Sequence, residues 1–222
     1  LYRGQLRDCY PISRLSAAYP ASVRKRLGLD APGCLWAKGD LKLLDTQRIS
    51  LVGSRELAEQ NRIFAERVGR EAARQGITLV SGNARGADRV AQDACLESGG
   101  RIISIVADEL SRKKLQTYPL RKNVLYLSED SFDLPFSAQR ALSRNRVIHA
   151  LGYLTFIAQS NSGTGGTWDG TAKNLRHGWS PVFCFDDGSP ATAELEQLGA
   201  TRIAPEQLAD LPALRSNMET FL

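Results

Sequence analysis

Three stretches of the sequence combine glycines with hydroxyl, amide or guanidinium side chains, as anion-binding turns do. The first, Arg48–Arg55, is an apolar run that ends in Gly53, Ser54 and Arg55. Ligands of open α/β sheets bind beyond the carboxyl ends of strands, at helix N-termini. Gly53 permits a sharp turn, Ser54 can donate a hydrogen bond, and Arg55 adds a donor fork suited to phosphate. We predict a phosphate site here; the alternative is a plain strand–helix turn with Arg55 in water.

The second stretch follows the next apolar run, over 77–80. Its loop consists of Ser81, Gly82, Asn83, Ala84, Arg85 and Gly86. Outward backbone N–H groups in such a loop, with a helix dipole behind them, hold an anion. The loop departs from the G-x-G-x-x-G pattern of dinucleotide sites. A purely structural turn is an equally good interpretation, with Asp88 favouring the helix dipole.

The third stretch follows an apolar run over 153–158. It contains Ser162, Gly163, Thr164, Gly165, Gly166 and Thr167. These residues predict another anion-binding turn at the same edge of the sheet. Trp168 then either stacks on a base or belongs to the core of the following helix.

Arg144, Asn145 and Arg146 lie within a predicted helix over 137–151. The apolar stripe of that helix is Ala138, Ala141, Leu142, Ile148 and Leu151. Asn145 falls inside the stripe, and a buried amide needs hydrogen-bond partners. It either ties down a neighbouring loop or braces the ligand pocket. We favour bracing, with both arginines reaching the pocket rim.

Strand and helix patterns alternate after residue 47. Strands are predicted over 49–52, 77–80, 102–106, 124–127, 153–158 and 182–185, with helices over 57–74, 87–95, 137–151, 191–198 and between the last two strands. This alternation predicts an α/β fold with a Rossmann-like, doubly wound, mostly parallel sheet and helices on both faces. We expect three parts: an N-terminal extension packed on the main domain (1–47), the Rossmann-like domain (48–205) and a C-terminal tail (206–222).

Composition and charge restrict the function. Apolar residues make up 42% of the chain and charged residues 24%, and no apolar run approaches the ~20 residues that span a membrane. Residues 1–90 hold 16 Lys or Arg against 9 Asp or Glu, while residues 147–222 hold 4 against 8. The basic front half suggests a face that attracts polyanions, although an unevenly charged solvated surface would look the same.

Cysteines and histidines show no ligand or catalytic pattern. The four cysteines form no C-x-x-C pair, and His149 and His177 lack companions for a metal site or a triad. We therefore expect no metal, no cofactor and no catalytic residue. The spacing of the cysteines suits a reducing compartment, so we expect a cytoplasmic protein that is not bound to a membrane.

The order of these motifs resembles the DNA-processing protein A family (DprA, also called Smf). The resemblance rests on Tyr19-Pro20, Leu35–Gly39, Val52–Arg55, Val80–Asp88, Tyr118-Pro119, Leu127–Glu129 and Ser143–Ile148. It implies a cytoplasmic binder of single-stranded DNA that helps to load a RecA-type recombinase during natural transformation and recombination. It also implies a homodimer without enzymatic activity. The apolar run Val182–Phe185 would then lie near an exposed edge of the sheet that needs cover.

The chain departs from the family pattern at several points. Asn83 replaces a bulky apolar residue, Ala87 replaces an isoleucine, and the loop from Ser162 to Ala172 is longer than usual. No winged-helix pattern follows residue 205. These differences indicate a stand-alone or divergent member.

The glycine loop also resembles the P-G-G-x-G-T-x-x-E motif of phosphoribohydrolases that act on nucleoside monophosphates. Aligning Gly166 and Thr167 with the G-T of that motif puts Gly170 in place of the catalytic glutamate. A glycine cannot polarise water or a leaving group, which disfavours the enzyme. A sensor of small nucleotides would use the same pocket and stays open as a third possibility.

Overall fold

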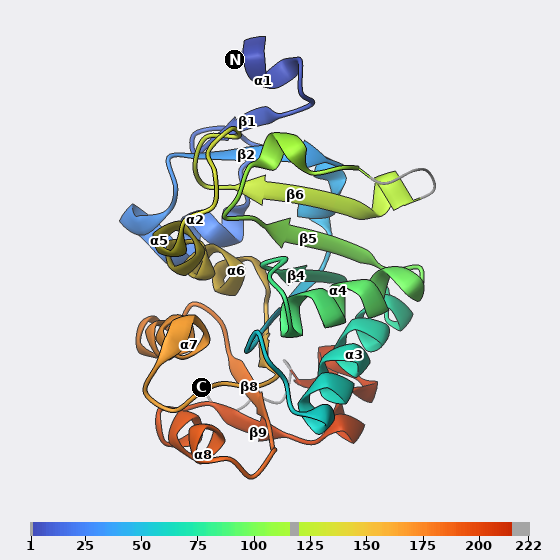
Figure 1. The fold of residues 1–222 in the computed structure, drawn as a ribbon, viewed down its shortest axis with the longest axis vertical. Coiled ribbons are helices and arrows are strands. Elements are labelled where there is room, and N and C mark those ends of the chain that lie inside the picture. The colour runs from blue at the N-terminus through green and yellow to red at the C-terminus, as the bar shows by residue number, and fades with distance from the viewer. Residues whose placement is uncertain (1, 116–119, 215–222) are drawn as a thin grey trace.

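The computed structural model describes residues 2–115 and 120–214, so the Tyr118-Pro119 motif lies outside the described residues. Nine strands form one sheet in the order β1-β2-β6-β5-β4-β3-β7-β8-β9 (Figure 1). The strands are β1 (Tyr10–Ser13), β2 (Cys34–Gly39), β3 (Arg48–Val52), β4 (Thr78–Ser81), β5 (Arg101–Ile105), β6 (Val124–Ser128), β7 (Thr155–Ile157), β8 (Val182–Phe185) and β9 (Thr201–Ile203). Strands β3 to β9 pair in parallel, which confirms the predicted Rossmann-like sheet.

The first two strands extend the sheet on one side. β1 pairs antiparallel with β2, and β2 pairs antiparallel with β6, with Trp36 opposite Ser128. Both come from the segment that we expect to be an N-terminal extension. The division of the chain at residues 47 and 205 stays a prediction.

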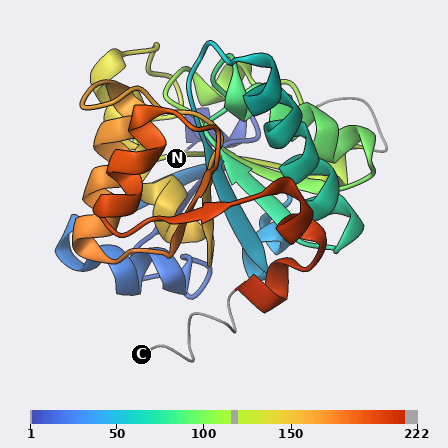
Figure 2. The same cartoon turned by 90° about the horizontal axis from the view of Figure 1, so that it is seen from below.

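Helices cover both faces of the sheet (Figure 2). They are α1 (Tyr2–Gln5), α2 (Ala21–Leu27), α3 (Glu59–Arg74), α4 (Ala87–Glu97), α5 (Ala138–Ser143), α6 (Asn145–Leu151), α7 (Gly165–His177) and α8 (Pro190–Gln197). α3 and α4 bury their apolar sides in one core layer, and α2, α6 and α8 bury theirs in the other. Glu66 and Arg70 form an i,i+4 ion pair on the exposed side of α3, at 3.5 Å.

Side chains of β3 alternate between the two layers, as the two-residue period of a strand requires. Ile49 and Leu51 enter the α3–α4 layer, and Val52 enters the opposite layer. Between them, the hydroxyl of Ser50 donates to the Ile148 carbonyl on α6 at 2.6 Å. β3 is therefore buried on both faces, which explains its continuous apolar sequence.

One expectation about the elements is wrong. The helix expected over 137–151 is two helices, α5 and α6, that meet at Arg144. α6 packs against the sheet in the same core layer as α2 and α8, whereas none of the α5 residues is buried. β8 lies near the edge of the sheet, as expected: the edge strand β9 covers it and pairs with it, with Phe185 opposite Ile203.

Candidate functional site

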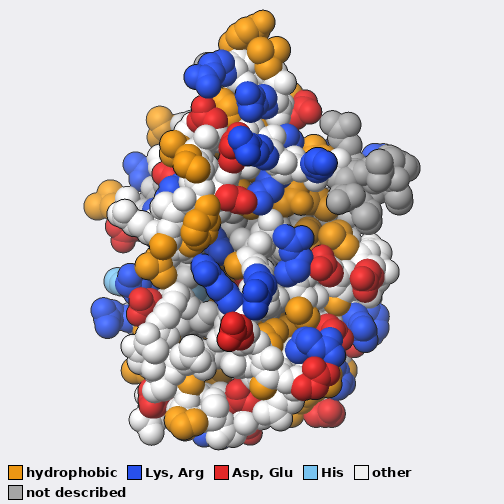
Figure 3. Space-filling view, viewed as in Figure 1, with side chains coloured by type: hydrophobic (Ala, Val, Ile, Leu, Met, Phe, Trp, Pro, Cys, Tyr) orange, Lys and Arg blue, Asp and Glu red, His pale blue; other side chains and the backbone are white. Residues whose placement is uncertain are grey.

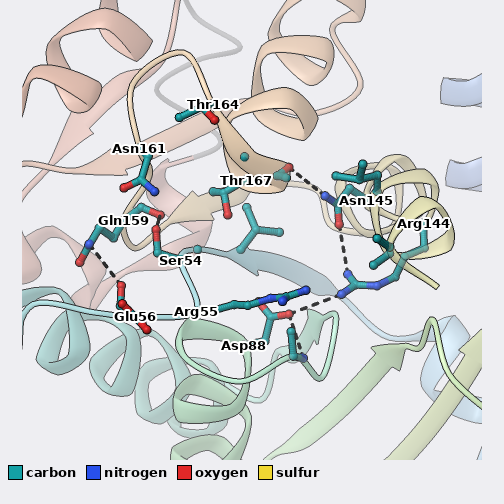
Figure 4. A pocket seen from close by; sticks show the side chains of 18 of the residues that line it. Ser54, Arg55, Glu56, Asp88, Arg144, Asn145, Gln159, Asn161, Thr164 and Thr167 are labelled. Atoms are coloured by element: carbon teal, nitrogen blue, oxygen red, sulfur yellow. Dashed lines mark hydrogen bonds and ion pairs between the residues drawn. The ribbon is translucent and has the colours of Figure 1, made fainter. Parts of the chain in front are cut away.

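A pocket of about 590 Å³ opens at the carboxyl ends of β3 and β7. From β3 the chain adds strands β4, β5 and β6 on one side of β3, and it later adds β7, β8 and β9 on the other side. The direction in which strands are added therefore reverses between β3 and β7. Such a reversal point is the usual ligand site of an open α/β sheet. The predicted residues that line the pocket are Gly53, Ser54, Arg55, Ala84, Arg144, Asn145, Thr164, Gly165, Gly166 and Thr167 (Figure 4).

The first two glycine loops are joined at Gly86. Its φ of 86° lies in the left-handed region that favours glycine, and a side chain there would collide with the carbonyl oxygens of Ser54 and Arg55. This close approach lets the Ala87 amide donate to the Ser54 carbonyl at 3.1 Å. The start of α4 is thereby held against the turn that carries Arg55.

Arg55 is the exposed positive charge of the pocket. It lies between this pocket and an adjoining hollow of about 510 Å³, and it lines both. Within residues 2–115 and 120–214, no acidic side chain forms an ion pair with Arg55. Its neighbour Glu56 instead approaches the highly exposed Arg85 at 3.8 Å. Figure 3 shows Lys and Arg side chains gathered near the middle of this face of the molecule.

Arg144 is a second cation of the pocket, and it is buried. Its Nη2 lies 3.8 Å from Oδ2 of Asp88, and its Nη1 donates to Oδ1 of Asn145 at 3.1 Å. Burial lowers the pKa of Arg144, Asp88 opposes that shift, and Arg55 adds to it. Burial likewise raises the pKa of Asp88, against the attraction of Arg144. Arg55 and Arg144 therefore repel each other across the pocket, and an anion between them would relieve that repulsion.

Asn145 connects the cationic side of the pocket to the third glycine loop. Its Nδ2 donates to the Gly166 carbonyl at 2.9 Å (Figure 4). Asn145 both ties down a loop and lines the pocket, so the two roles that the sequence left open coincide. The bond fixes the first turn of α7, whose Gly165, Gly166 and Thr167 face the pocket.

The N-terminus of α7 lacks a side-chain cap. Thr164 occupies the capping position without forming a side-chain hydrogen bond to the helix. The first amides of a helix have no partners within the helix, so they are available to a ligand. Trp168 on α7 packs against the core, as the second of its two interpretations proposed.

Several predicted site residues lie away from the pocket. Arg146 points to a different hollow, where its Nη2 lies 2.9 Å from Oε2 of Glu129. Ser81 is buried, and its hydroxyl donates to the Leu51 carbonyl at 2.7 Å. Ser162 donates to Glu194 at 2.5 Å, and Gly163, at a φ of 64°, is also outside the lining. Gly82, Asn83 and Arg85 line the adjoining hollow instead.

Other residues of the pocket were not predicted. Gln159 and Asn161 lie just before the third loop, and Leu142 forms part of the wall although the sequence placed it in the core. Leu142 remains 49% exposed, because α5 packs beside α7 rather than on the sheet. His149 also lines the pocket. It follows Asn145 by four residues, a spacing that places both on one side of a helix and could have indicated it.

The described residues lack the features of two other kinds of site. No helix among the described residues is long and apolar enough to cross a membrane. In the same part of the chain, no three His, Cys, Asp or Glu side chains are grouped so that they could hold a metal ion.

Comparisons with known proteins agree with the fold and the motif order. The family model for DNA recombination-mediator protein A matches residues 11–211. DprA of Bacillus subtilis is 30% identical over 95% of this chain and 73% of its own length. DprA of Streptococcus pneumoniae is 31% identical over 72% of this chain. Its X-ray structure superposes on this chain with a TM-score of 0.77 and 27% identity, and the superposition covers 90% of this chain and 72% of that chain.

A structure of DprA from Helicobacter pylori, described for its single-stranded DNA binding mode, has the same fold, with a TM-score of 0.73 and 24% identity over 96% of both chains. The matched region spans about half of the S. pneumoniae protein (54%) and 38% of the Escherichia coli protein Smf. The resemblance of the motifs is therefore confirmed: the chain belongs to the DNA recombination-mediator protein A family.

Proposed function

We propose that this chain binds single-stranded DNA, and that backbone phosphates enter the pocket at the ends of β3 and β7. One observation carries the proposal: Arg55 is exposed, lines both adjoining hollows, and forms no ion pair with an acidic side chain in the described part of the chain. The uncapped start of α7 supplies backbone donors on the other side of the pocket. The likeness to a single-stranded DNA-binding DprA supports the choice of ligand.

The geometry favours single strands over duplex. The pocket is concave and has an apolar wall that includes Leu142 and Ala141, so phosphate and base can enter together only where bases are free to splay. Contacts to the backbone carry little sequence information, so the phosphate contacts by themselves should tolerate different sequences.

The test is fluorescence anisotropy with a labelled oligonucleotide and the variant Arg55→Ala. Loss of a charge-assisted hydrogen bond should weaken binding by about 1–3 kcal/mol. Arg70→Ala is the matched control, because Arg70 is also an exposed arginine but is paired with Glu66 on α3. Equal losses in the two variants would mean that diffuse charge, rather than the pocket, binds DNA. No binding at low salt, together with binding of free nucleotides, would favour the small-nucleotide sensor.

We further propose that the protein mediates recombination by helping to load a RecA-type recombinase, as a cytoplasmic homodimer that serves natural transformation. This part of the proposal rests on membership of the family alone. The chain spans only about half or less of the length of the S. pneumoniae and E. coli relatives, so their full activities are not shown for it. Stimulation of RecA filament formation on an oligonucleotide, and a dimer mass by light scattering at micromolar concentration, would support it. A monomer mass would count against the dimer.

We propose that the pocket does not hydrolyse nucleotides. The acidic side chains that line it among the described residues are Glu56 and Asp88. Asp88 is already engaged by Arg144 and by the Ala84 amide, and Gly170 offers no carboxylate. Release of free base from AMP, lost when a pocket residue is changed, would overturn this proposal.

A further inference from the structure

The imidazole of His149 presents an unused hydrogen-bond donor to the pocket. The side chain is fully buried, yet it lines the pocket, and its Nε2 has no hydrogen-bond partner among the described residues. A buried polar atom without a partner is costly, so native structures usually satisfy it. A ligand in the pocket would supply the missing acceptor.

The other ring nitrogen fixes where the proton lies. Oδ1 of Asn174 accepts from the Ser180 amide at 2.9 Å, which identifies Nδ2 as the donor end of the Asn174 side chain. That Nδ2 lies 3.1 Å from Nδ1 of His149, so Nδ1 accepts. Burial lowers the pKa of His149 to about 3, so the ring is neutral and its one proton is on Nε2.

Gly170 places no side chain against this part of the imidazole. A Cβ on residue 170 would lie 3.3 Å from Nε2 of His149 and 3.1 Å from Cβ of Asn145. A larger side chain would therefore fill the space in front of Nε2. In this chain the residue aligned with the catalytic glutamate of the phosphoribohydrolases is Gly170, which has no side chain, and the neutral donor of His149 lies next to it.

A neutral donor suits a different part of the ligand than the arginines do. The positive charges of the lining belong to Arg55 and Arg144, and phosphate is attracted there. In addition to His149, the uncharged part of the lining includes the apolar side chains of Val52, Ala141 and Leu142. A nucleobase has both an apolar face and uncharged carbonyl or ring-nitrogen acceptors, so it matches this combination.

We propose that His149 donates its Nε2–H to an uncharged acceptor of a base that enters the pocket, and so selects bases by their acceptors. This inference rests on the proposed binding of single-stranded DNA. It assigns His149 a role in specificity, separate from the phosphate contacts of Arg55.

The test uses an oligonucleotide in which a single thymine lies among abasic sites, so that only one base is available. A second oligonucleotide carries difluorotoluene there, which has the shape of thymine but very weak acceptors. The protein should bind the thymine oligonucleotide more tightly by on the order of tenfold, the effect of one lost hydrogen bond at a buried donor. The variant His149→Phe, which lacks the donor, should bind both oligonucleotides equally, whereas His149→Gln should retain part of the preference.

The outcomes separate this inference from the proposed function. If the unmodified protein binds oligo(dT) in a salt-dependent manner but does not distinguish thymine from difluorotoluene, the role of His149 is overturned and DNA binding stands. If the preference persists in His149→Phe, another residue provides the donor and the role of His149 is also overturned. If no oligonucleotide binds at low salt, both proposals fail. The comparison in the unmodified protein needs no variant to fold.

Discussion

The guanidinium of Arg144 occupies the space that a side chain at Gly82 would fill. A Cβ at this position would collide with Cζ and both terminal nitrogens of Arg144. The absence of a side chain at Gly82 thus allows a buried arginine at the start of α6 to reach the pocket. The loop and the arginine, 62 residues apart in the chain, are a single unit of structure.

The first prediction follows from this contact. Gly82→Ala should push Arg144 out of place and weaken both DNA binding and folding. Overpacking a filled site destabilises by about 1–3 kcal/mol. Urea unfolding and anisotropy measure the two effects. Gly33→Ala is the control, because a Cβ at Gly33 meets nothing within 4 Å. Unchanged stability and affinity in Gly82→Ala would show that Arg144 has another position available.

The second prediction concerns salt. Each phosphate neutralised on a single strand releases about 0.7 of a counterion, so the logarithm of the binding constant falls linearly with the logarithm of salt concentration. Arg55→Ala should reduce that slope by about 0.7 if Arg55 contacts one phosphate. Arg70→Ala should leave the slope as it is. A slope that is the same in all three proteins would remove Arg55 from the phosphate contacts.

The third prediction concerns pH and the buried His149. Its pKa in the folded chain is about 3, lowered by burial, against about 6.5 in an unfolded chain. The unfolded state therefore binds a proton that the folded state refuses between these values. The contribution of the neutral His149 ring to the free energy of unfolding is fully present above the unfolded-state pKa of about 6.5. It falls by up to about 1.4 kcal/mol per pH unit as the pH decreases from there toward 3.

Urea unfolding at pH 7, 6 and 5 should show this loss in the unmodified protein, and a shallower one in His149→Gln. Asp88 and Glu129 contribute with the opposite sign, because burial raises the pKa of both carboxyl groups, but they are common to the two proteins. Parallel stability curves would mean that His149 does not carry the effect.

The fourth prediction concerns the buried pair of Asp88 and Arg144. Removing one charge from such a pair leaves the other uncompensated and costs about 3–5 kcal/mol. Asp88→Asn should therefore destabilise strongly, although an amide oxygen can still accept from the Ala84 amide as Asp88 does at 3.2 Å. Combining it with Arg144→Met removes both charges, so the double variant should be less destabilised than the sum of the single ones. Additive losses in urea unfolding would show that the two side chains do not interact.

Much of the fold could be predicted because buried parallel strands leave a strong pattern. Val52 and Val80 end apolar runs that are followed at once by glycine loops, and both strands are central in the sheet. Loops at the carboxyl ends of parallel strands meet at one edge whatever their separation in sequence. This is why Arg55, Ala84 and Gly166 come together as the sequence indicates.

The orientation of individual side chains could not be predicted in the same way. Arg144 and Arg146 are two residues apart, and a straight helix would not decide which one faces the pocket. The chain bends at Arg144, and Arg146 pairs with Glu129, a contact that depends on how β6 and α6 approach each other. Leu142 looked like a core residue because its spacing is helical, but α5 borders the pocket instead of the sheet. The spacing of apolar residues identifies the apolar face of a helix, but it does not show whether that face packs against the sheet or borders a pocket.

In sequence order, the first residue of the pocket lining is Val52 and the last is Thr167. The lining residues follow strands that lie on either side of β3 in the sheet. Its last wall, the start of α7, depends on β7 lying in register with β3, where Phe156 pairs with Leu51. During synthesis, the chain emerges from its N-terminus. A ribosome-bound chain therefore carries Arg55 long before it carries the rest of the pocket, and it acquires a complete site only after residue 167 has left the exit tunnel and the seventh strand has docked.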